Sequence, residues 1–357
     1  MRCNKKKSHQ KSDIFFTTTS QLEDNINFRN FILINWFEIS IRFSLINKYF
    51  RKLTLFKQMD TKYLKMKIII TGGTGFLGQR LCRKLEQMNN DIMTYDIVDG
   101  FDILNTEQLE KTFIDFKPDS IIHLAACSDL NIFAKQPEIS YKINVIGTRN
   151  ILKLCQKHNT RLLFASTCCC YGNNDTHPSD ETSPTCPTEP YAESKKISEK
   201  EILDVGFPHC CMRLATFYGP EMRAALAPAV FIDKAHKNET IEIHGSGKQT
   251  RTMTYVDDIV NGIVTIVENK PIYTVINVTT EEITSVIDMI RHAKNLTGNN
   301  VECINVIDRD GQIREEMIHS KRLQSLGWKW ETSFEEGMEK SYKYYLNNDK
   351  KWPNKTE

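Results

Sequence analysis

Residues 67–78, KIIITGGTGFLG, decide the fold of this 357-residue chain. The three consecutive isoleucines predict a buried β-strand, and the amphipathic residues 77–88 predict a helix. Between them, Gly72, Gly75 and Gly78 allow a sharp turn and a close approach of the backbone to a ligand, while the start of the helix presents unpaired N–H groups. A strand, a glycine-rich turn and a helix in this order predict a site for a dinucleotide pyrophosphate.

An acidic residue follows at a suitable place. Asp96 ends the second predicted strand, where a carboxylate can accept hydrogen bonds from the adenosine ribose hydroxyls. The same charge would repel a 2′-phosphate, so we predict NAD rather than NADP as the cofactor. The alternative is a purely structural glycine turn, with Asp96 as a solvated strand end.

Apolar runs and amphipathic stretches alternate beyond this turn. The predicted strands are 67–71, 91–96, 120–125, 161–167 and 210–216, and the predicted helices are 77–88, 106–116, 139–158 and 191–203. This alternation predicts an α/β fold, a Rossmann-type doubly wound parallel sheet with helices on both faces. After about residue 217, further helices are predicted at 227–236, 257–267, 285–296 and 333–345. They indicate a smaller C-terminal substrate-binding lobe.

Three regions follow from these patterns: a poorly ordered extension (1–65), an NAD-binding Rossmann core (66–185), and a catalytic helix with the substrate-binding lobe, partly interleaved with the core (186–350). The extension contains an apolar run at 31–50. Glu38 and Arg42 near the middle of this run disfavour a membrane anchor, and the absence of a small-residue cleavage site after it disfavours a secretory signal.

Charge and cysteine content exclude other classes of protein. Lys plus Arg number 47 and Asp plus Glu 45, so no basic field favours nucleic acid. The eleven cysteines are an odd number with irregular spacing, which indicates a reducing cytoplasm rather than a disulfide framework. Cys168, Cys169 and Cys170 are adjacent; on a strand they would point to alternating faces, so we predict packing and no metal site.

A second group of residues carries acid–base chemistry. Tyr191 and Lys195 are four residues apart on a predicted helix and therefore share a face. A nearby ammonium group lowers the pKa of a phenol, which suits a general base at neutral pH. Thr167, at the end of a strand, supplies a hydroxyl that can orient the reacting oxygen. A tyrosine and a lysine at this spacing also occur on ordinary helix surfaces, but with the nucleotide turn they predict a catalytic triad.

Together these motifs resemble the extended short-chain dehydrogenase/reductases, specifically the NAD-dependent nucleotide-sugar epimerase/dehydratase family and its UDP-glucose 4-epimerase-like members. The resemblance runs from residue 66 to about residue 346. Its markers are TGGTGFLG (71–78), Asp96, Asp102-Ile103, HLAA (123–126), Asn144, Gly147-Thr148, STCCCYG (166–172), YAESK (191–195), RLATFYGP (213–220), GSGKQTRTMTYVDD (245–258) and RDGQIR (309–314).

The resemblance implies a role for individual residues. The implied cofactor-binding residues are Gly72, Gly75, Phe76, Leu77 and Gly78 at the pyrophosphate, Asp96 at the ribose, Asp102 and Ile103 at the adenine, Ala125 and Ala126 along the cofactor, and Tyr191 and Lys195 at the nicotinamide ribose. The implied substrate-binding residues are Thr167, Arg251, Arg309 and, as a weaker candidate, Arg223. Arginine suits this role because its planar fork binds phosphate groups in a bidentate way.

Three departures from the family pattern bear on the reaction. Dehydratases of this family carry an acid/base pair where this chain has Cys168 and Cys169, so dehydration is disfavoured. Thr216 stands where many sugar epimerases have Asn, and Gln312 where an Asp is usual. The sugar pocket is therefore expected to differ from that of the common UDP-galactose epimerases.

The expected activity is epimerisation of a nucleotide-diphosphate sugar, at C4 of a UDP-hexose, through a transient 4-keto intermediate. One alternative is a nucleotide-sugar 4-ketoreductase or dehydrogenase, which would use the same triad but exchange its cofactor. Another is a non-catalytic NAD-binding scaffold, against which the intact Thr167, Tyr191 and Lys195 argue. The resemblance also implies a homodimer that pairs through helices 139–158 and 191–203. The cysteines predict a cytoplasmic location, the charge balance predicts no nucleic-acid partner, and Glu38 and Arg42 disfavour a membrane partner.

Overall fold

The computed structural model describes residues 65–173, 178–308 and 311–353. The chain divides into two compact units, residues 1–64 and 65–357, and the fold below is that of the second unit. The apolar run at 31–50 lies outside the described residues, and so does Arg309. Predictions about them stay predictions. Among the helices of the described part, none combines the length and the apolar character needed to cross a membrane.

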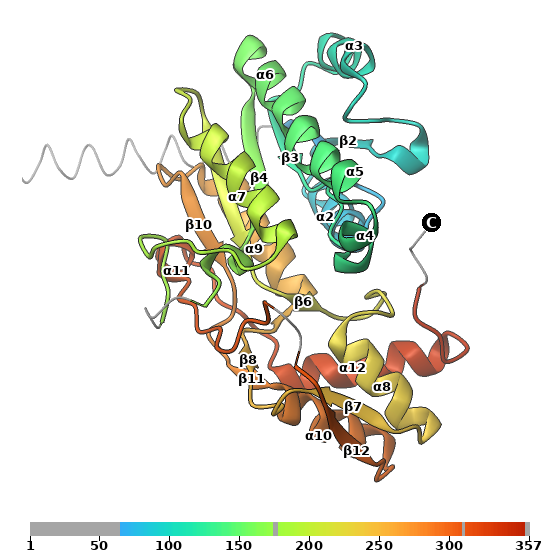
Figure 1. Ribbon diagram of the computed structural model, residues 1–357. Coiled ribbons are helices and arrows are strands. Elements are labelled where there is room, and N and C mark those ends of the chain that lie inside the picture. Colours follow the sequence, from blue (N-terminus) through green and yellow to red (C-terminus); the bar gives the residue numbers. More distant parts are fainter. Residues whose placement is uncertain (1–64, 174–177, 309–310, 354–357) are drawn as a thin grey trace, which may run out of the picture. The chain divides into compact units, whose positions relative to one another are not determined.

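A six-stranded parallel sheet forms the centre of the unit, in the order β10-β5-β4-β3-β1-β2 (Figure 1). This confirms the predicted doubly wound α/β fold. The order reverses at β1, because β2 lies on one side of it and β3 on the other. The strands are β1 (Lys67–Thr71), β2 (Asp91–Tyr95), β3 (Ser120–His123), β4 (Arg161–Thr167), β5 (His209–Leu214) and β10 (Val275–Val278).

Helices cover both faces of the sheet, and the side-chain alternation of β1 shows why. Ile68 and Ile70 pack with α2 (Phe76–Gln87) and α9 (Val256–Asn269). Ile69 points the other way, toward the core formed with the helices of the opposite face. Those helices are α3 (Thr106–Phe116), α6 (Thr148–His158) and α7 (Pro190–Leu203). A strand buried on both faces must be continuously apolar, as the isoleucine run is.

The predicted helix at 139–158 is not a single α-helix. The chain forms α5 (Pro137–Tyr141), a π-helical segment (Lys142–Gly147) and then α6. A π segment widens the helix by one residue per turn, which hydrophobic periodicity does not reveal. It is rare and often marks a functional position, and here it contains Asn144.

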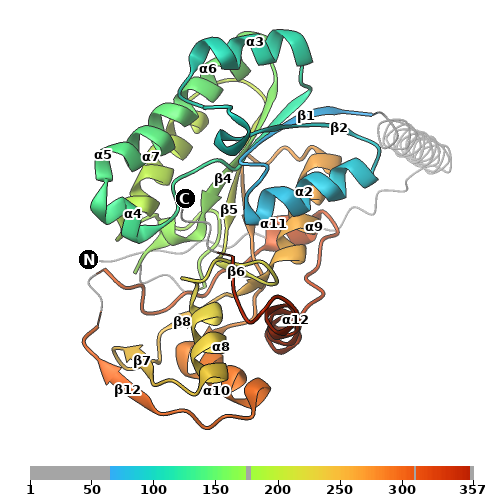
Figure 2. The same cartoon turned by 90° about the vertical axis from the view of Figure 1, so that its right-hand side faces the viewer.

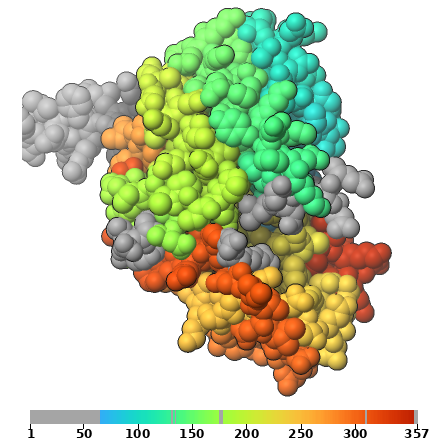
Figure 3. All heavy atoms as spheres, viewed as in Figure 1, coloured from blue at the N-terminus to red at the C-terminus, as the bar shows by residue number. Residues whose placement is uncertain are grey.

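The second lobe is built from helices and short strand pairs (Figure 2). Helices α8 (Ala227–Lys237), α10 (Val286–Thr297) and α12 (Phe334–Asn347) share one hydrophobic core. The strand pairs are β7 (Ile241–His244) with β12 (Cys303–Val306), β8 (Thr250–Arg251) with β11 (Thr284–Ser285), and β6 (Phe217–Tyr218) with β9 (Thr254–Tyr255). In Figure 3 the surface of this lobe, yellow to red, lies mostly below the green surface of the core.

The core and the lobe are more interleaved than a boundary at residue 185 suggests. Strands β5 and β10 and helix α9 all follow that residue, yet they complete the sheet and one of its covering layers. Within the described residues, the remaining helices are α4 (Leu130–Lys135), α11 (Lys321–Ser325) and the 3-10 turns η1 (Ile97–Asp99) and η3 (Cys168–Tyr171).

Candidate active site

A cleft of about 1710 Å³ lies at the carboxyl ends of the central strands, where doubly wound folds bind their ligands. Its walls come from the sheet side and from the lobe. Every predicted site residue that the structure describes lines this cleft: Gly72, Gly75, Phe76, Leu77, Gly78, Asp96, Asp102, Ile103, Ala125, Ala126, Thr167, Tyr191, Lys195, Arg223 and Arg251.

The glycine-rich turn has the geometry that a pyrophosphate needs. Gly72 has φ +71°, and a Cβ atom there would stand 2.8 Å from the backbone nitrogen of Ala125. A Cβ atom on Gly78 would stand 2.8 Å from the Cα of Gly73, so the helix can pack against the turn only with glycine there. No side chain caps the N-terminus of α2. Its first N–H groups and the positive end of its dipole are thus available to an anionic ligand.

Asp96 is held in place by the backbone around it. Its Oδ2 accepts a hydrogen bond from the Thr74 N–H at 3.0 Å, and its Oδ1 accepts one from the Val98 N–H at 3.2 Å. The residue is only 8% exposed, at the edge of the cleft. Next to it, Asp102 Oδ1 accepts a hydrogen bond from the Leu104 N–H at 2.8 Å. A carboxylate fixed in this way can receive ribose hydroxyls without losing rotamer freedom when the cofactor binds.

His123, part of the HLAA motif, is fully buried and lies in a chain of hydrogen bonds. Thr148 Oγ1 donates to the Asn144 carbonyl at 2.6 Å and therefore accepts from the Nε2–H of His123, at 2.9 Å. The Nδ1 of His123 then accepts from Thr71 Oγ1 at 2.6 Å, and this oxygen accepts from the Ala125 N–H at 3.2 Å. Burial and the nearby charge of Lys195 lower the pKa of His123 to about 3, so the ring is neutral.

Asn144, in the π segment, joins α7 to the loop after β3. Its Oδ1 accepts from the Cys127 N–H at 2.8 Å, while its Nδ2 donates to the Cys127 carbonyl at 3.0 Å and to Ser194 Oγ at 2.9 Å. Its backbone carbonyl accepts a further hydrogen bond from Ser198 at 3.0 Å. The widened helix turn thus places one amide side chain between two walls of the cleft.

Tyr191 and Lys195 both lie on α7 and line the cleft, as predicted, but their electrostatics differ from the prediction. Lys195 is 2% exposed, and its Nζ lies 4.6 Å from the centroid of the Phe164 ring. Burial lowers the pKa of Lys195 to about 7.

For Tyr191, burial raises the pKa of the phenol, and the neighbouring Cys169 adds to this increase. The predicted lowering by Lys195 is therefore wrong for the chain by itself. The cation that opposes the increase is Arg223. The i, i+4 spacing places two residues on one face, but it does not place the ends of their side chains together.

The three adjacent cysteines do not lie on a strand. Strand β4 ends at Thr167, whose Oγ1 accepts from the Cys169 N–H at 3.2 Å and caps the 3-10 turn η3. Cys168 and Cys170 are buried, and Cys169 borders the cleft. Burial raises the pKa of Cys169 to about 12, so its thiol stays protonated. Across the described ranges, no three His, Cys, Asp or Glu side chains are grouped so that they could hold a metal ion.

A buried ion pair fixes α7 to the sheet. Glu199, one turn after Lys195, pairs with Arg213 of β5 at 2.6 Å, and its Oε2 accepts from Ser166 Oγ at 2.6 Å. Ser166 directly precedes Thr167 on β4. One carboxylate therefore connects the helix of Tyr191 and Lys195 to the strand end that carries Thr167. Sequence reasoning missed this pair, because both residues are ordinary surface types in isolation.

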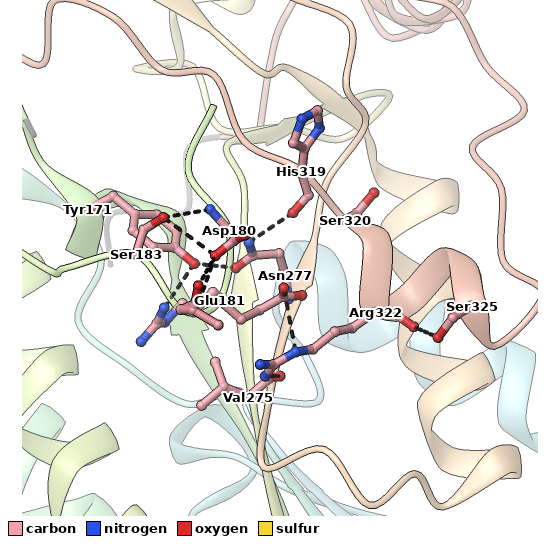
Figure 4. Close-up of polar contacts among 12 residues, drawn as sticks. Tyr171, Asp180, Glu181, Ser183, Val275, Asn277, His319, Ser320, Arg322 and Ser325 are labelled. Atoms are coloured by element: carbon pink, nitrogen blue, oxygen red, sulfur yellow. Dashed lines mark hydrogen bonds and ion pairs between the residues drawn. The ribbon is translucent and has the colours of Figure 1, made fainter. Parts of the chain in front are cut away.

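The same network continues toward the C-terminal segment (Figure 4). Arg213 Nη1 donates to the Tyr171 hydroxyl at 2.8 Å, which in turn donates to Asn277 Oδ1 at 2.8 Å. The Asn277 N–H donates to Glu181 at 3.0 Å, and Arg322 pairs with Glu181 at 3.7 Å. The wall of the cleft beside η3 thus rests on β10, the strand that the sequence analysis did not predict.

Two described arginines of the lobe, Arg223 and Arg251, line the cleft. Arg251 Nη1 donates to the carbonyls of Thr250 at 2.7 Å and Ile313 at 2.8 Å. Its charge opposes the increase in pKa that burial causes at Glu316, whose Oε1 accepts from the hydroxyl of Thr252 at 2.9 Å.

Comparison with known proteins agrees with this geometry. The match to the NAD dependent epimerase/dehydratase family covers residues 68–279. The chain is 30% identical over 308 residues to UDP-glucuronic acid decarboxylase 1 of Xenopus tropicalis, covering 79% of this chain and 72% of that protein. It is 28% identical over 361 residues to dTDP-D-glucose 4,6-dehydratase of Dictyostelium discoideum, covering 81% and 83%.

Among solved structures, UDP-glucose 4-epimerase of Thermotoga maritima, determined with UDP-glucose, aligns with a TM-score of 0.74 and 26% identity over 79% of this chain and 99% of that one. The relatives act on nucleotide sugars but carry out different reactions. The predicted cofactor, NAD, is confirmed by the family and fits the glycine turn and Asp96. The chain therefore belongs to the NAD dependent epimerase/dehydratase family.

Proposed function

We propose that the protein is an epimerase that inverts C4 of a nucleotide-diphosphate hexose, a UDP-hexose, through a transient 4-keto sugar. The supporting observation is that Thr167, Tyr191 and Lys195 share one cleft with the glycine turn, while a thiol at Cys169 stands where the dehydratases of this family carry an acid. When bound, NAD supplies the hydride acceptor and, in the return step, the donor.

Tyr191 is the group that exchanges a proton with the sugar O4 atom. Its pKa is raised by burial, so the phenolate needs cations near it. The charge of Arg223 acts in this direction, and Lys195 adds to it once the ribose of the cofactor orders its ammonium group. The Thr167 hydroxyl lines the same wall and orients O4 between donor and base. Because both 4-epimers present a hydroxyl to the same tyrosine, one base serves both directions.

Dehydration needs a group that delivers a proton to the leaving hydroxyl. Burial and the nearby Glu316 raise the pKa of the Cys169 thiol to about 12, so ionisation of this thiol is disfavoured. Thiols at Cys168 and Cys169 therefore leave the 4-keto sugar without an acid/base pair for elimination. The keto sugar then has one outcome that these residues support, the return of hydride to the other face.

A proposed homodimer accompanies this function. Helices α6 and α7 lie side by side on one face of the sheet, with exposed apolar side chains at Ile139 and Tyr141 on α5 and Leu203 on α7. A two-fold pairing of these helices would cover them. The cytoplasm is the proposed location, because the ten free cysteines in the described part of the chain suit a reducing compartment.

The decisive experiment is conversion of UDP-glucose and UDP-galactose in deuterated water, followed by NMR and mass spectrometry. An epimerase interconverts the two sugars with catalytic amounts of NAD⁺ and leaves C4 and C5 without solvent deuterium. A 4,6-dehydratase eliminates the C5 proton with the C6 hydroxyl and moves the C4 hydride to C6, so it would give a 6-deoxy product with solvent deuterium at C5. A dehydrogenase would reduce NAD⁺ stoichiometrically. Either result would refute the proposal. Tyr191→Phe should lower turnover roughly 10² to 10⁴-fold and retain NAD binding, whereas Tyr141→Phe, at an exposed position, should not.

A further inference from the structure

Ser166 and Glu199 connect the two elements that carry the proposed triad. Thr167 ends β4, whereas Tyr191 and Lys195 lie on α7, which packs along β4. Ser166 Oγ donates to Glu199 Oε2 at 2.6 Å, and both residues are buried. Ser166 directly precedes Thr167 and lines the same cleft. One buried hydrogen bond therefore ties the end of the strand to the helix.

The alternation of side chains along β4 gives this bond its importance. Phe164 and Ser166 face α7, since Phe164 belongs to the core on that side and Ser166 bonds to the helix. Ala165 and Thr167 alternate with them, and Ala165 packs in the core of the opposite side. Within the described ranges, the Thr167 side chain has one hydrogen bond, from the Cys169 N–H, and none to α7. The position of Thr167 relative to α7 is thus set through its neighbour.

The Glu199 carboxylate is held in one orientation by Arg213. Arg213 lies directly opposite Ser166 in the pairing of β5 with β4, so both side chains point to the same face of the sheet. Its Nη2 donates to Glu199 Oε1 at 2.6 Å, and its Nε lies 3.2 Å from each carboxylate oxygen. A guanidinium fork of this kind fixes a carboxylate and leaves Oε2 directed toward Ser166.

The Glu199 charge is balanced by Arg213 and does not act on the proposed triad from a distance. The pKa of Lys195 is lowered by burial, with no contribution from Glu199, although the two residues lie one turn apart on α7. The effect of Glu199 on the triad is therefore one of position rather than of charge.

We propose that Ser166, held by Glu199, is a positioning residue that sets the separation of the Thr167 hydroxyl and the Tyr191 phenol. The inference rests on the proposed function, in which both groups must reach the O4 atom of the sugar together. A misplacement of about 1 Å between reacting groups can lower turnover about 10²-fold. Ser166 exchanges no proton with the sugar, because its hydroxyl hydrogen is directed to Glu199.

The test is Ser166→Ala in the full-length protein, assayed with UDP-glucose and NAD⁺. This variant keeps the ion pair of Glu199 with Arg213 and removes only the link to β4. We expect kcat to fall roughly 10- to 100-fold. The KM and the dissociation constant of NAD should change less than about twofold, because no binding contact is lost. The isotope effect on kcat with a C4-deuterated sugar should rise, because hydride transfer becomes the slow step.

Two further substitutions keep the result interpretable if Ser166→Ala does not fold. Ser166→Thr retains the hydroxyl and should recover most of the wild-type kcat, whereas Ser166→Val has the same shape without the hydroxyl and should not. Equal kcat in these two variants would overturn the inference, since they differ only in the group that bonds to Glu199.

The matched control is Ser341→Ala. Ser341 is fully buried on α12 in the lobe, and its Oγ donates to the Gly337 carbonyl at 2.7 Å. Its replacement removes a comparable buried hydrogen bond outside the cleft, so thermal stability should fall while kcat stays unchanged. If Ser341→Ala lowers kcat as much as Ser166→Ala, the effect is one of general stability and the inference is overturned.

The outcomes separate this inference from the proposed function. If the wild type epimerises UDP-glucose and Ser166→Ala leaves kcat unchanged or raises only KM, the inference fails and the proposed function stands. If the wild type does not interconvert UDP-glucose and UDP-galactose, the proposed function fails. Crystal structures of the wild type and Ser166→Ala with NAD then test the inference by themselves. A changed separation of Thr167 Oγ1 and Tyr191 Oη would support it, and an unchanged separation would overturn it.

Discussion

The Lys195 ammonium nitrogen lies 4.6 Å from the centroid of the Phe164 ring, so a buried cation at the floor of the cleft rests on the face of an aromatic side chain. Phe164 belongs to β4, three residues before Thr167. A cation over a ring is favoured by the ring quadrupole, most strongly when water is excluded. Burial nevertheless lowers the pKa of Lys195 to about 7, which makes its charge sensitive to pH near neutrality.

Replacing this ring should shift the pH dependence of activity. Phe164→Leu removes the quadrupole that favours the ammonium form, so the pKa of Lys195 falls further. The activity that needs the ammonium is present below this pKa and is lost as pH rises through it. The alkaline limb of kcat/KM for the free enzyme should therefore move to lower pH, and Phe164→Tyr should keep it in place.

The matched control for this shift is Phe113→Leu. Phe113 is a buried phenylalanine of α3 whose ring contacts His158 rather than Lys195. The Phe113→Leu substitution should lower the stability of the fold by a comparable amount without moving the alkaline limb of kcat/KM. An unmoved limb in Phe164→Leu would show that the ring has only a packing role.

The buried histidine predicts how stability varies with pH. The pKa of His123 is about 3 in the folded chain, against about 6.5 when it is solvated. The neutral ring of His123 therefore contributes fully to the free energy of unfolding above about pH 6.5. This contribution is lost as the pH falls toward 3, because the unfolded chain takes up the proton first. The free energy of unfolding, measured in urea at several pH values, should fall less steeply with acid in His123→Gln than in the wild type. Equal slopes would mean that the ring titrates normally in the folded protein.

Cofactor choice should depend on the charge of Asp96. Asp96→Asn keeps an oxygen that can accept from the Thr74 or Val98 N–H but removes the charge that repels a 2′-phosphate. The dissociation constants of NAD and NADP, which we expect to differ in favour of NAD, should approach each other. Asp99→Asn, at an exposed acid on the same turn, serves as the control. Similar constants for the two cofactors in the wild type would contradict the assignment.

Replacing only one member of the buried ion pair of Glu199 and Arg213 should strongly lower the free energy of unfolding. Glu199→Gln leaves the Arg213 charge without its partner, and losses of about 3 to 5 kcal/mol are typical when one member of a buried pair is removed. The double change Glu199→Met with Arg213→Met should recover part of that stability. Urea unfolding of the wild type, Glu199→Met, Arg213→Met and the double variant measures the coupling, and additive effects would show that the pair is not coupled.

Local patterns were sufficient for much of the fold. The isoleucine run of β1, the strand β4 and the helix α3 begin and end at the predicted residues, because apolar periodicity and turn residues act over a few positions. The glycine turn and Asp96 were recognisable for the same reason, since a pyrophosphate site is built from one short stretch of backbone and the end of the next strand. Strand β10, only four residues long, had no such signal and was found only in the sheet.

The electrostatics of the site were decided by tertiary structure. No local pattern shows that Glu199 meets Arg213, that His123 is fixed between Thr71 and Thr148, or that Arg223 rather than Lys195 opposes the increase in the pKa of Tyr191. Each depends on burial and on side chains brought together from distant parts of the chain. A residue type and its spacing determine which chemistry is available, but the pKa of a group depends on the water and the charges around it, and those exist only once the sheet and the lobe have closed around the cleft.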